Sequence, residues 1–354
     1  MRIALITSLE QSVPPVKYGG TERVVAELAD GLVERGHDVY LLASGDSKTK
    51  ATLVPVIPRA IRTMYDNRTI DAWREYWKYE GIAQSLLKIK SIKPDIVHNH
   101  LAWRFILFEQ SIPHLMVSTM HGPLAIERER KTYTDHADHA FVSISNNQRR
   151  TIPDLNWIAT VYNGIEVERF TPSFEGTKDY FAFVGRTSPE KGLAEIVQLI
   201  LKSPYRLKIA AKVDSVDEGY FKERVEPFVD GKKIEFLGEV GHEQKNELLQ
   251  GAKALLLWLN WEEPFGLVVP EANACGTPVI VNKRGSMPEL IEEGRTGFLV
   301  KTQKEMLNRL SEVQTLNRRA CRERVEKHFS VTAMVDGYER VYKQLARQKG
   351  RKAS

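Results

Sequence analysis

The chain has 354 residues, a net charge of +5 and an apolar share of 42%, which is ordinary for a globular protein. Its length suggests two domains of roughly 150–200 residues each. No apolar run reaches about 18 residues, which excludes a membrane-spanning helix, and the basic excess lies in residues 341–354, so no nucleic-acid-binding surface is indicated.

The two cysteines and the start of the chain bear on its location. Cys275 and Cys321 are too few for a disulfide framework and fit a reducing compartment. A strand pattern follows Met1-Arg2 directly, so we expect no signal peptide and a cytoplasmic protein.

The first strand and helix are predicted from residues 2–7 and 21–35. The run RIALIT predicts a buried strand, and Thr21 is a candidate N-cap for a helix with apolar residues at helical spacing. Gly19 and Gly20 precede that helix, and glycine lets backbone N–H groups approach a phosphate or a sugar. A tight turn explains the pair equally well. Asp38–Ala43 is predicted as the next strand.

Residues 44–80 are predicted as a helical region. Asp66–Tyr79 is rich in aromatic residues, which could stack on a sugar, although core packing is the commoner explanation. A helix is also predicted for Ile82–Ile92.

Histidines follow two predicted strands. Pro94–His98 is followed by Asn99 and His100, and Leu115–Thr119 is followed by His121. No carboxylate or cysteine completes a metal site near the first pair, so we expect a loop at the rim of a cleft. His121 ends a strand where α/β proteins form sites, which favours a functional role. The histidines of Thr134–His139 are interpreted as the end of a helix.

A second strand–helix alternation begins at Tyr180–Val184. Gly185 opens a loop that contains Arg186 and Lys191, and a helix is predicted to about Lys202. Both cations can point at one phosphate group, although such a pair is usually only solvated. Further strands are predicted for Arg206–Ala211 and Lys233–Leu237, and Val240 follows the latter.

Two carboxylates flank a loop further along the chain. An apolar run, Ala254–Leu259, predicts a strand, and Leu267–Cys275 predicts a helix. Glu263 lies in the loop and Glu271 one turn into the helix. A carboxylate can accept two hydroxyl protons, so the pair suits a ligand with two vicinal diols. Solvated surface acids are the ordinary alternative.

Four stretches together resemble a known family. E-P-F-G-L-V-x-x-E-A-x-A-C-G-T-P-V from Glu263 resembles the E-x7-E signature of retaining glycosyltransferases of the GT-B architecture, and looks most like family 4. Y-G-G-T-E-R-V-V from Tyr18, the T-x-H-G that ends in Gly122, and G-R-x-x-x-x-K-G from Gly185 are similar to other motifs of that family. The resemblance covers roughly residues 2–345. Pro270 departs from it but is tolerated in a first helical turn.

The resemblance implies an α/β protein with two facing Rossmann-like, doubly wound domains and an active site between them. We expect an N-terminal domain at 1–166, to which a last helix at 331–348 returns, and a donor-binding domain at 167–330. The implied reaction moves a hexose from a nucleotide sugar, UDP-glucose before GDP-mannose, to an unidentified hydroxyl acceptor. It retains the anomeric configuration and needs no metal or other cofactor.

The resemblance also implies roles for individual residues. Arg186 and Lys191 would hold the diphosphate, Glu263 the sugar hydroxyls, Glu271 the ribose, and His121 the sugar from the other domain. Further donor-binding residues would be Gly19, Gly20, Gly185, Val240, Phe265, Gly266 and Leu267. A nucleotide-sugar epimerase and a non-catalytic nucleotide-binding module are the alternatives. The basic tail, Arg347 to Lys352, would contact anionic lipid weakly or stay in solvent.

Overall fold

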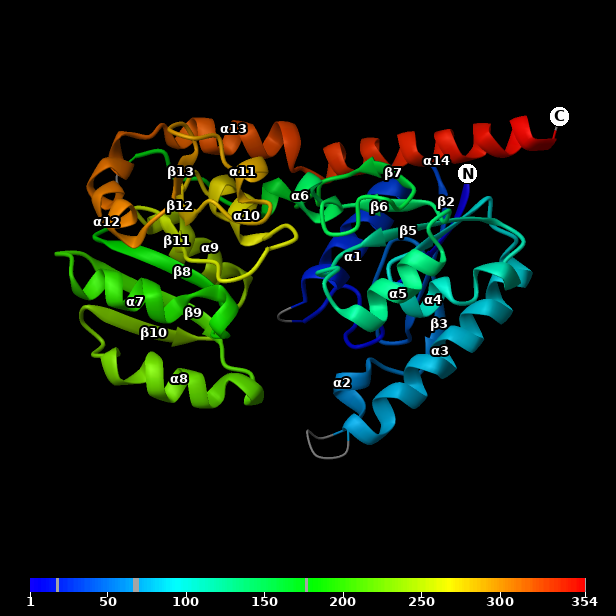
Figure 1. The fold of residues 1–354 in the computed structure, drawn as a ribbon, viewed down its shortest axis with the longest axis horizontal. Helices are drawn as coiled ribbons and strands as arrows, with labels where there is room; N and C mark the ends of the chain where they lie inside the picture. The colour runs from blue at the N-terminus through cyan, green and yellow to red at the C-terminus, as the bar shows by residue number, and fades with distance from the viewer. Residues whose placement is uncertain (17–18, 66–69, 176–177, 354) are drawn as a thin grey trace. The chain divides into compact units, whose positions relative to one another are not determined.

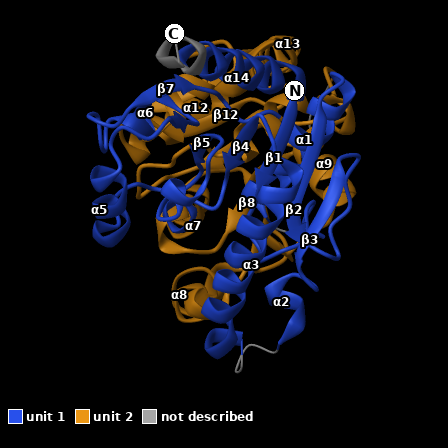
Figure 2. Ribbon diagram, turned by 90° about the vertical axis from the view of Figure 1, so that its right-hand side faces the viewer, with its two compact units in different colours: residues 1–164, 331–354 blue, residues 165–330 orange. Residues whose placement is uncertain are grey.

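The computed structural model describes residues 1–16, 19–65, 70–175 and 178–353, and side chains up to residue 348. The chain forms two compact units, shown in two colours in Figure 2. Unit 1 consists of residues 1–164 and 331–354, and unit 2 of residues 165–330. Each unit is an α/β layer structure and is described here by itself.

Unit 1 is built on a parallel seven-stranded sheet in the order β3-β2-β1-β4-β5-β6-β7. Figure 1 labels several of these strands and the helices around them. Its strands are β1 Arg2–Ile6, β2 Asp38–Ser44, β3 Thr52–Ile57, β4 Ile96–Asn99, β5 Leu115–Met120, β6 Phe141–Ser143 and β7 Trp157–Thr160. The winding direction reverses between β1 and β4. In open α/β sheets, ligands bind beyond the carboxyl ends of the strands at such a switch point.

Helices connect these strands. They are α1 Gly20–Glu34, α2 Ile61–Met64, α3 Ile70–Ile92, α4 Trp103–Ile106, α5 Glu127–Asp135, α6 Asn146–Arg149 and α14 Val331–Ala353. The last of these comes from the far end of the chain and packs on α1. Gly31 in α1 permits this contact, because a Cβ there would lie 2.7 Å from Cγ2 of Val335.

Unit 2 is built on a six-stranded parallel sheet in the order β10-β9-β8-β11-β12-β13. Its strands are β8 Tyr180–Arg186, β9 Arg206–Lys212, β10 Ile234–Gly238, β11 Leu255–Leu257, β12 Val279–Asn282 and β13 Gly297–Val300. Its helices are α7 Leu193–Leu201, α8 Glu218–Arg224, α9 His242–Gly251, α10 Val268–Ala274, α11 Met287–Leu290, α12 Gln303–Glu312 and α13 Arg318–His328. Here the switch point lies between β8 and β11. Two doubly wound sheets confirm the predicted α/β class.

Three predictions for unit 1 are wrong in detail. Helix α1 already begins at Gly20, so Thr21 lies inside its first turn and is not the N-cap. The region 44–80 contains strand β3. This strand was not predicted from the sequence, because Pro55 interrupts its apolar pattern. β3 lies at the edge of the sheet, where proline is tolerated. Helix α3 runs unbroken from Ile70 to Ile92, and residues 66–69 of the predicted aromatic segment lie outside the described residues.

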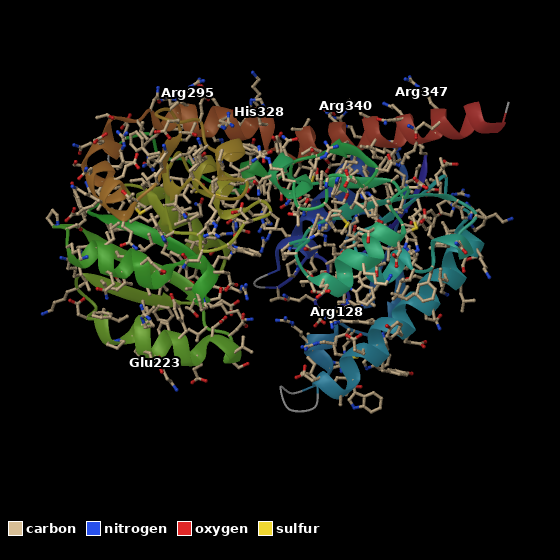
Figure 3. The ribbon with its side chains drawn as sticks, in the orientation of Figure 1. Arg128, Glu223, Arg295, His328, Arg340 and Arg347 are labelled. Atoms are coloured by element: carbon tan, nitrogen blue, oxygen red, sulfur yellow. The ribbon has the colours of Figure 1, made fainter. Side chains whose placement is uncertain are left out.

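The C-terminal helix, predicted at 331–348, buries its apolar face. Tyr338 and Tyr342 of α14 are both 0% exposed. Arg340 and Arg347 lie on its solvent face, and Figure 3 shows both pointing away from the ribbon. The rest of the basic tail lies beyond the described side chains. Within the described residues, no helix has both the length and the apolar character needed to cross a bilayer.

Candidate active site

The predicted site residues fall into two groups, one in each unit. In unit 2, Arg186 ends β8, and Glu263 lies in the loop after β11. These two strands flank the switch point of that sheet, so their carboxyl ends bring the loops together. In unit 1, Gly19 follows β1 and His121 follows β5, again at the carboxyl ends of strands.

The side chains of Lys191 and Glu263 are in direct contact, although 72 positions in the sequence separate the two residues. Lys191 Nζ forms an ion pair with Glu263 Oε2, and both side chains are largely buried. Trp261 Nε1 donates a second hydrogen bond to the same carboxylate oxygen at 3.0 Å. The Lys191 ammonium also lies 4.9 Å from the centre of the Trp261 ring, within the range of a cation–π contact. The second carboxylate oxygen, Oε1, is not part of these bonds.

Two glycines make this approach possible. Gly192 has a φ of +66°, and a Cβ there would lie 1.7 Å from the carbonyl oxygen of Trp258. Gly285 has a φ of +58°, and a Cβ there would lie 2.5 Å from the backbone nitrogen of Glu263. Only glycine fits such positions. Neither glycine was predicted to have a role, although both follow basic residues in loops after strands.

Arg186 is held by a different carboxylate. Its Nη2 lies 2.5 Å from Oε1 of Glu190, four residues further along the chain. The guanidinium is partly exposed, with 28% of the side chain accessible. Arg186 and Lys191 therefore stand at the same sheet edge, each with its own carboxylate partner.

Glu271 is buried in α10 and paired with Lys245 of α9. Lys245 Nζ donates to Oε1 of Glu271 at 2.6 Å. Lys245 was not predicted as a site residue, because no motif marks it and only the packing of α9 brings it near Glu271. Burial, followed by the negative charge of Glu271, raises the pKa of Cys275 to about 12, so this thiol is protonated and unreactive at neutral pH.

The remaining donor-binding candidates of unit 2 differ in what they can offer. Gly185 lies within β8, and Val240 and Leu267 are partly exposed near the ends of β10 and α10. Gly266 has a φ of +89°, which requires glycine. The ring of Phe265 is buried and packs edge-to-face on Phe329, so a donor-binding role for this residue depends on its backbone.

A cluster of histidines occupies the carboxyl edge of the sheet in unit 1. His100 Nδ1 lies 2.8 Å from His121 Nε2. His98 lies within β4, in agreement with the predicted strand Pro94–His98, but both His98 and His100 are buried and neither is exposed at a rim. The two nitrogens of His98 contact Tyr342 OH at 2.7 Å and Thr119 Oγ1 at 2.8 Å. Within the described ranges, no group of three or more His, Cys, Asp or Glu is arranged to hold a metal ion.

The glycine pair of unit 1 borders a buried carboxylate. Gly20 is the first residue of α1, and a Cβ at Gly19 would lie 2.8 Å from Pro15 and 3.1 Å from Glu22 Oε2. Burial raises the pKa of Glu22. Glu22 is part of the Y-G-G-T-E-R-V-V motif, but no role was predicted for it. Tyr18 of the same motif lies outside the described residues.

Because of the histidine cluster, we expect the free energy of unfolding to fall in acid. Burial lowers the pKa of His121 to about 4, and those of His98 and His100 to well below 6.5. Below pH 6.5 the unfolded chain therefore binds more protons than the folded chain. We expect each histidine to remove up to about 1.4 kcal/mol of unfolding free energy per pH unit as the pH falls toward 4. Urea unfolding at a series of pH values measures this slope.

The matched variant for this prediction is His121→Gln, which removes one titrating ring and keeps a polar amide. Its unfolding free energy should depend less steeply on pH between 6.5 and 4 than that of the unmodified protein. Equal slopes for the two proteins would contradict the assignment of a depressed pKa to His121.

Two family models match consecutive parts of the chain. The model described as Glycosyltransferase Family 4 matches residues 18–169, and the model described as Glycosyl transferases group 1 matches residues 164–328. The first covers most of unit 1, and the second covers nearly all of unit 2.

Known proteins resemble the chain over most of its length. Glycogen synthase of Mycobacterium tuberculosis is 25% identical, with 84% of this chain and 81% of that protein covered. The structure of sucrose-phosphate synthase from Thermosynechococcus elongatus superposes with a TM-score of 0.79 at 18% identity, covering 97% and 98% of the chains. HepE of Anabaena, solved with UDP and glucose, gives a TM-score of 0.74 at 17% identity, covering 97% and 100%. Both likenesses show the shared two-unit fold.

Proposed function

Since the chain belongs to the family 4 glycosyltransferases of the GT-B fold, we propose that it moves a hexose from a nucleoside diphosphate donor to an acceptor hydroxyl. In this proposal the anomeric configuration is retained and no metal ion is needed. UDP-glucose is our preferred donor and GDP-mannose the second choice.

The observation that carries the proposal is the meeting of Lys191 and Glu263 at the switch point of the unit 2 sheet. A cation and a carboxylate side by side suit a ligand that joins a diphosphate to a sugar. Lys191, with Arg186 nearby at the same edge, would bind the diphosphate and stabilise the charge that grows on it as the glycosidic bond breaks. Glu263 would accept hydrogen bonds from the sugar hydroxyls.

Glu271 would bind the ribose diol in this scheme. Its carboxylate is already fixed by Lys245, which leaves the second oxygen, Oε2, to accept hydroxyl protons. His121 of unit 1 would donate to or accept from the transferred sugar. The HepE structure holds UDP and glucose, which supports a uridine donor that carries glucose.

The test of the proposal is a thermal-shift panel of UDP-glucose, GDP-mannose and ADP-glucose, followed by a transfer assay with the best ligand. A donor at 100 times its Kd adds about 2.7 kcal/mol of stability. Product analysis separates transfer to an acceptor from epimerisation of the donor alone. Binding of none of the three donors would contradict the proposal.

The two glutamates should have separable effects. We expect Glu271→Gln to weaken binding of bare UDP by roughly tenfold or more, because a charge-assisted hydrogen bond to the ribose is lost. Glu263→Gln should leave UDP affinity near its original value and lower turnover of the intact nucleotide sugar. Isothermal titration and steady-state kinetics measure the two quantities.

Glu262→Gln is the matched control for these variants. Glu262 neighbours Glu263 but is exposed and pairs with Arg284 at 3.2 Å. It should change neither UDP affinity nor turnover. Equal losses of UDP affinity in Glu263→Gln and Glu271→Gln would refute the proposed division of roles.

Metal independence gives a further expected result. Transfer should persist in EDTA, because Arg186 and Lys191 supply the positive charge at the diphosphate. Initial rates with and without the chelator measure this. Complete loss of activity that Mg²⁺ or Mn²⁺ restores would count against the proposed mechanism.

We place the protein in the cytoplasm. Cys275 and Cys321 are free and buried, which fits a reducing compartment. Fractionation of the native host measures the location, and recovery of the protein in an oxidising compartment would contradict it.

A further inference from the structure

The His121 side chain and its backbone are both held by buried groups of unit 1. Gln148 is 4% exposed, and its Nε2 donates to the carbonyl oxygens of Met120 and Gly122, both at 2.9 Å. These two carbonyls flank His121. The amide oxygen of Gln148 accepts from the backbone N–H of Ile144 at 3.0 Å, which fixes which end of the amide faces His121. The backbone carbonyl groups on both sides of His121 are therefore held by the same buried amide.

The ring itself is held at one nitrogen. His121 Nε2 lies 2.8 Å from His100 Nδ1, and the two rings are stacked with their centres 5.1 Å apart. His100 is in turn packed against His98, with 3.9 Å between the ring centres. His121 is partly exposed and its Nδ1 forms no hydrogen bond with the described residues, so Nδ1 is the nitrogen left for a ligand.

Each of these rings carries one proton at neutral pH. Burial holds the pKa of His100 well below 6.5 and lowers that of His121 to about 4. A bond between two neutral imidazoles needs one donor and one acceptor nitrogen. Either His100 Nδ1 carries the proton and His121 Nε2 accepts it, or the reverse holds.

The far side of the His100 ring distinguishes the two arrangements. His100 Nε2 is buried and has no hydrogen-bond partner among the residues that the structure describes. If His121 donated, the proton of His100 would sit on this nitrogen and form an unpaired buried N–H. Buried N–H groups are rarely left unpaired, because the donor loses its bond to water. If His100 donates from Nδ1, only a lone pair is left at Nε2.

We propose that His100 is a positioning residue that fixes His121 in the tautomer with its proton on Nδ1, so that His121 presents a hydrogen-bond donor at the carboxyl end of β5. What this tautomer does in catalysis rests on the proposed function. His121 donates to an oxygen of the nucleotide sugar and does not act as the base that deprotonates the acceptor. A ligand oxygen with a lone pair is accepted at this position, and a ligand N–H is rejected.

The experiment reads the tautomer directly by nitrogen NMR of the full-length protein labelled with ¹⁵N-histidine. The chain has nine histidines, and the spectrum of His121→Gln assigns the signals of His121 by their loss. We expect Nδ1 of His121 to show the shift of a protonated nitrogen and Nε2 that of an unprotonated one. A proton on Nε2 in the unmodified protein overturns the proposal, whatever the enzymatic activity. Because the spectrum needs no substrate, failure of the proposed function would be seen separately.

An isosteric pair of variants tests the role of His100. His100→Asn keeps an N–H near the position of Nδ1, whereas His100→Asp offers only an acceptor there. The Asn variant should keep the proton on Nδ1 of His121. The Asp variant should move it to Nε2 when recorded at about pH 8.5, where the imidazole stays neutral beside the new carboxylate. With the proton moved, kcat should fall on the order of tenfold or more with little change in KM. A folded Asp variant that retains the original tautomer overturns the role of His100.

Discussion

The Lys191→Met variant is expected to lose about 30-fold or more in kcat/KM, and to remain folded. Removing one charge-assisted contact to a diphosphate costs about 2–5 kcal/mol. The loss has two sources in this structure. The diphosphate loses a cation, and Glu263 loses the ion pair that fixes its position. Methionine keeps the aliphatic volume beside Trp261, so the change is mainly one of charge. Steady-state kinetics and a thermal melt measure the two properties.

Arg186→Ala should produce a loss of similar size without disturbing Glu263, since Arg186 is paired with Glu190. Lys202→Met is the control, because Lys202 is an exposed lysine that caps the far end of α7. It should leave kcat/KM unchanged. Near-original kinetics in both Lys191→Met and Arg186→Ala would show that the diphosphate binds elsewhere.

The sequence predicts the sheets of both units well where strands are continuous apolar runs. Every apolar residue of β1 and the first four residues of β8 are buried, because both faces of a parallel sheet are covered, so no polar residue interrupts either apolar run. Two strands were missed: β12, which is only four residues long, and β3, which is at an edge and contains Pro55. An edge strand needs fewer hydrogen bonds and less apolar surface, so its sequence carries a weaker signal.

For the candidate site, the sequence identifies charged residues but not their partners. Lys191 and Glu263 were assigned to different parts of a ligand, and the structure joins them directly. Neither Lys245 nor Gln148 was predicted, although each fixes a predicted site residue. Such pairings depend on which helix packs beside which strand end. Spacing along the chain constrains these contacts only weakly.

Deleting Val331–Ser354 should abolish both the folding of unit 1 and activity. Helix α14 contributes Met334, Val335, Tyr338, Val341, Tyr342 and Leu345 to the core of that unit, each at most 6% exposed. Full burial of one such side chain is worth about 1.5–3 kcal/mol, so the six together approach or exceed the usual 5–15 kcal/mol of a folded domain. Circular dichroism, solubility and a transfer assay measure the outcome.

Two further variants locate the effect within the helix. Deleting Gln348–Ser354 removes none of the six buried residues, so stability and transfer to a soluble acceptor should not change, and at most binding to anionic vesicles should fall. Tyr342→Phe keeps the packing but removes the hydroxyl that lies 2.7 Å from His98 Nδ1. It leaves a buried polar nitrogen without its partner, which should cost about 1–3 kcal/mol of unfolding free energy. If the chain without Val331–Ser354 stayed folded and active, α14 could not be an essential part of the unit 1 core.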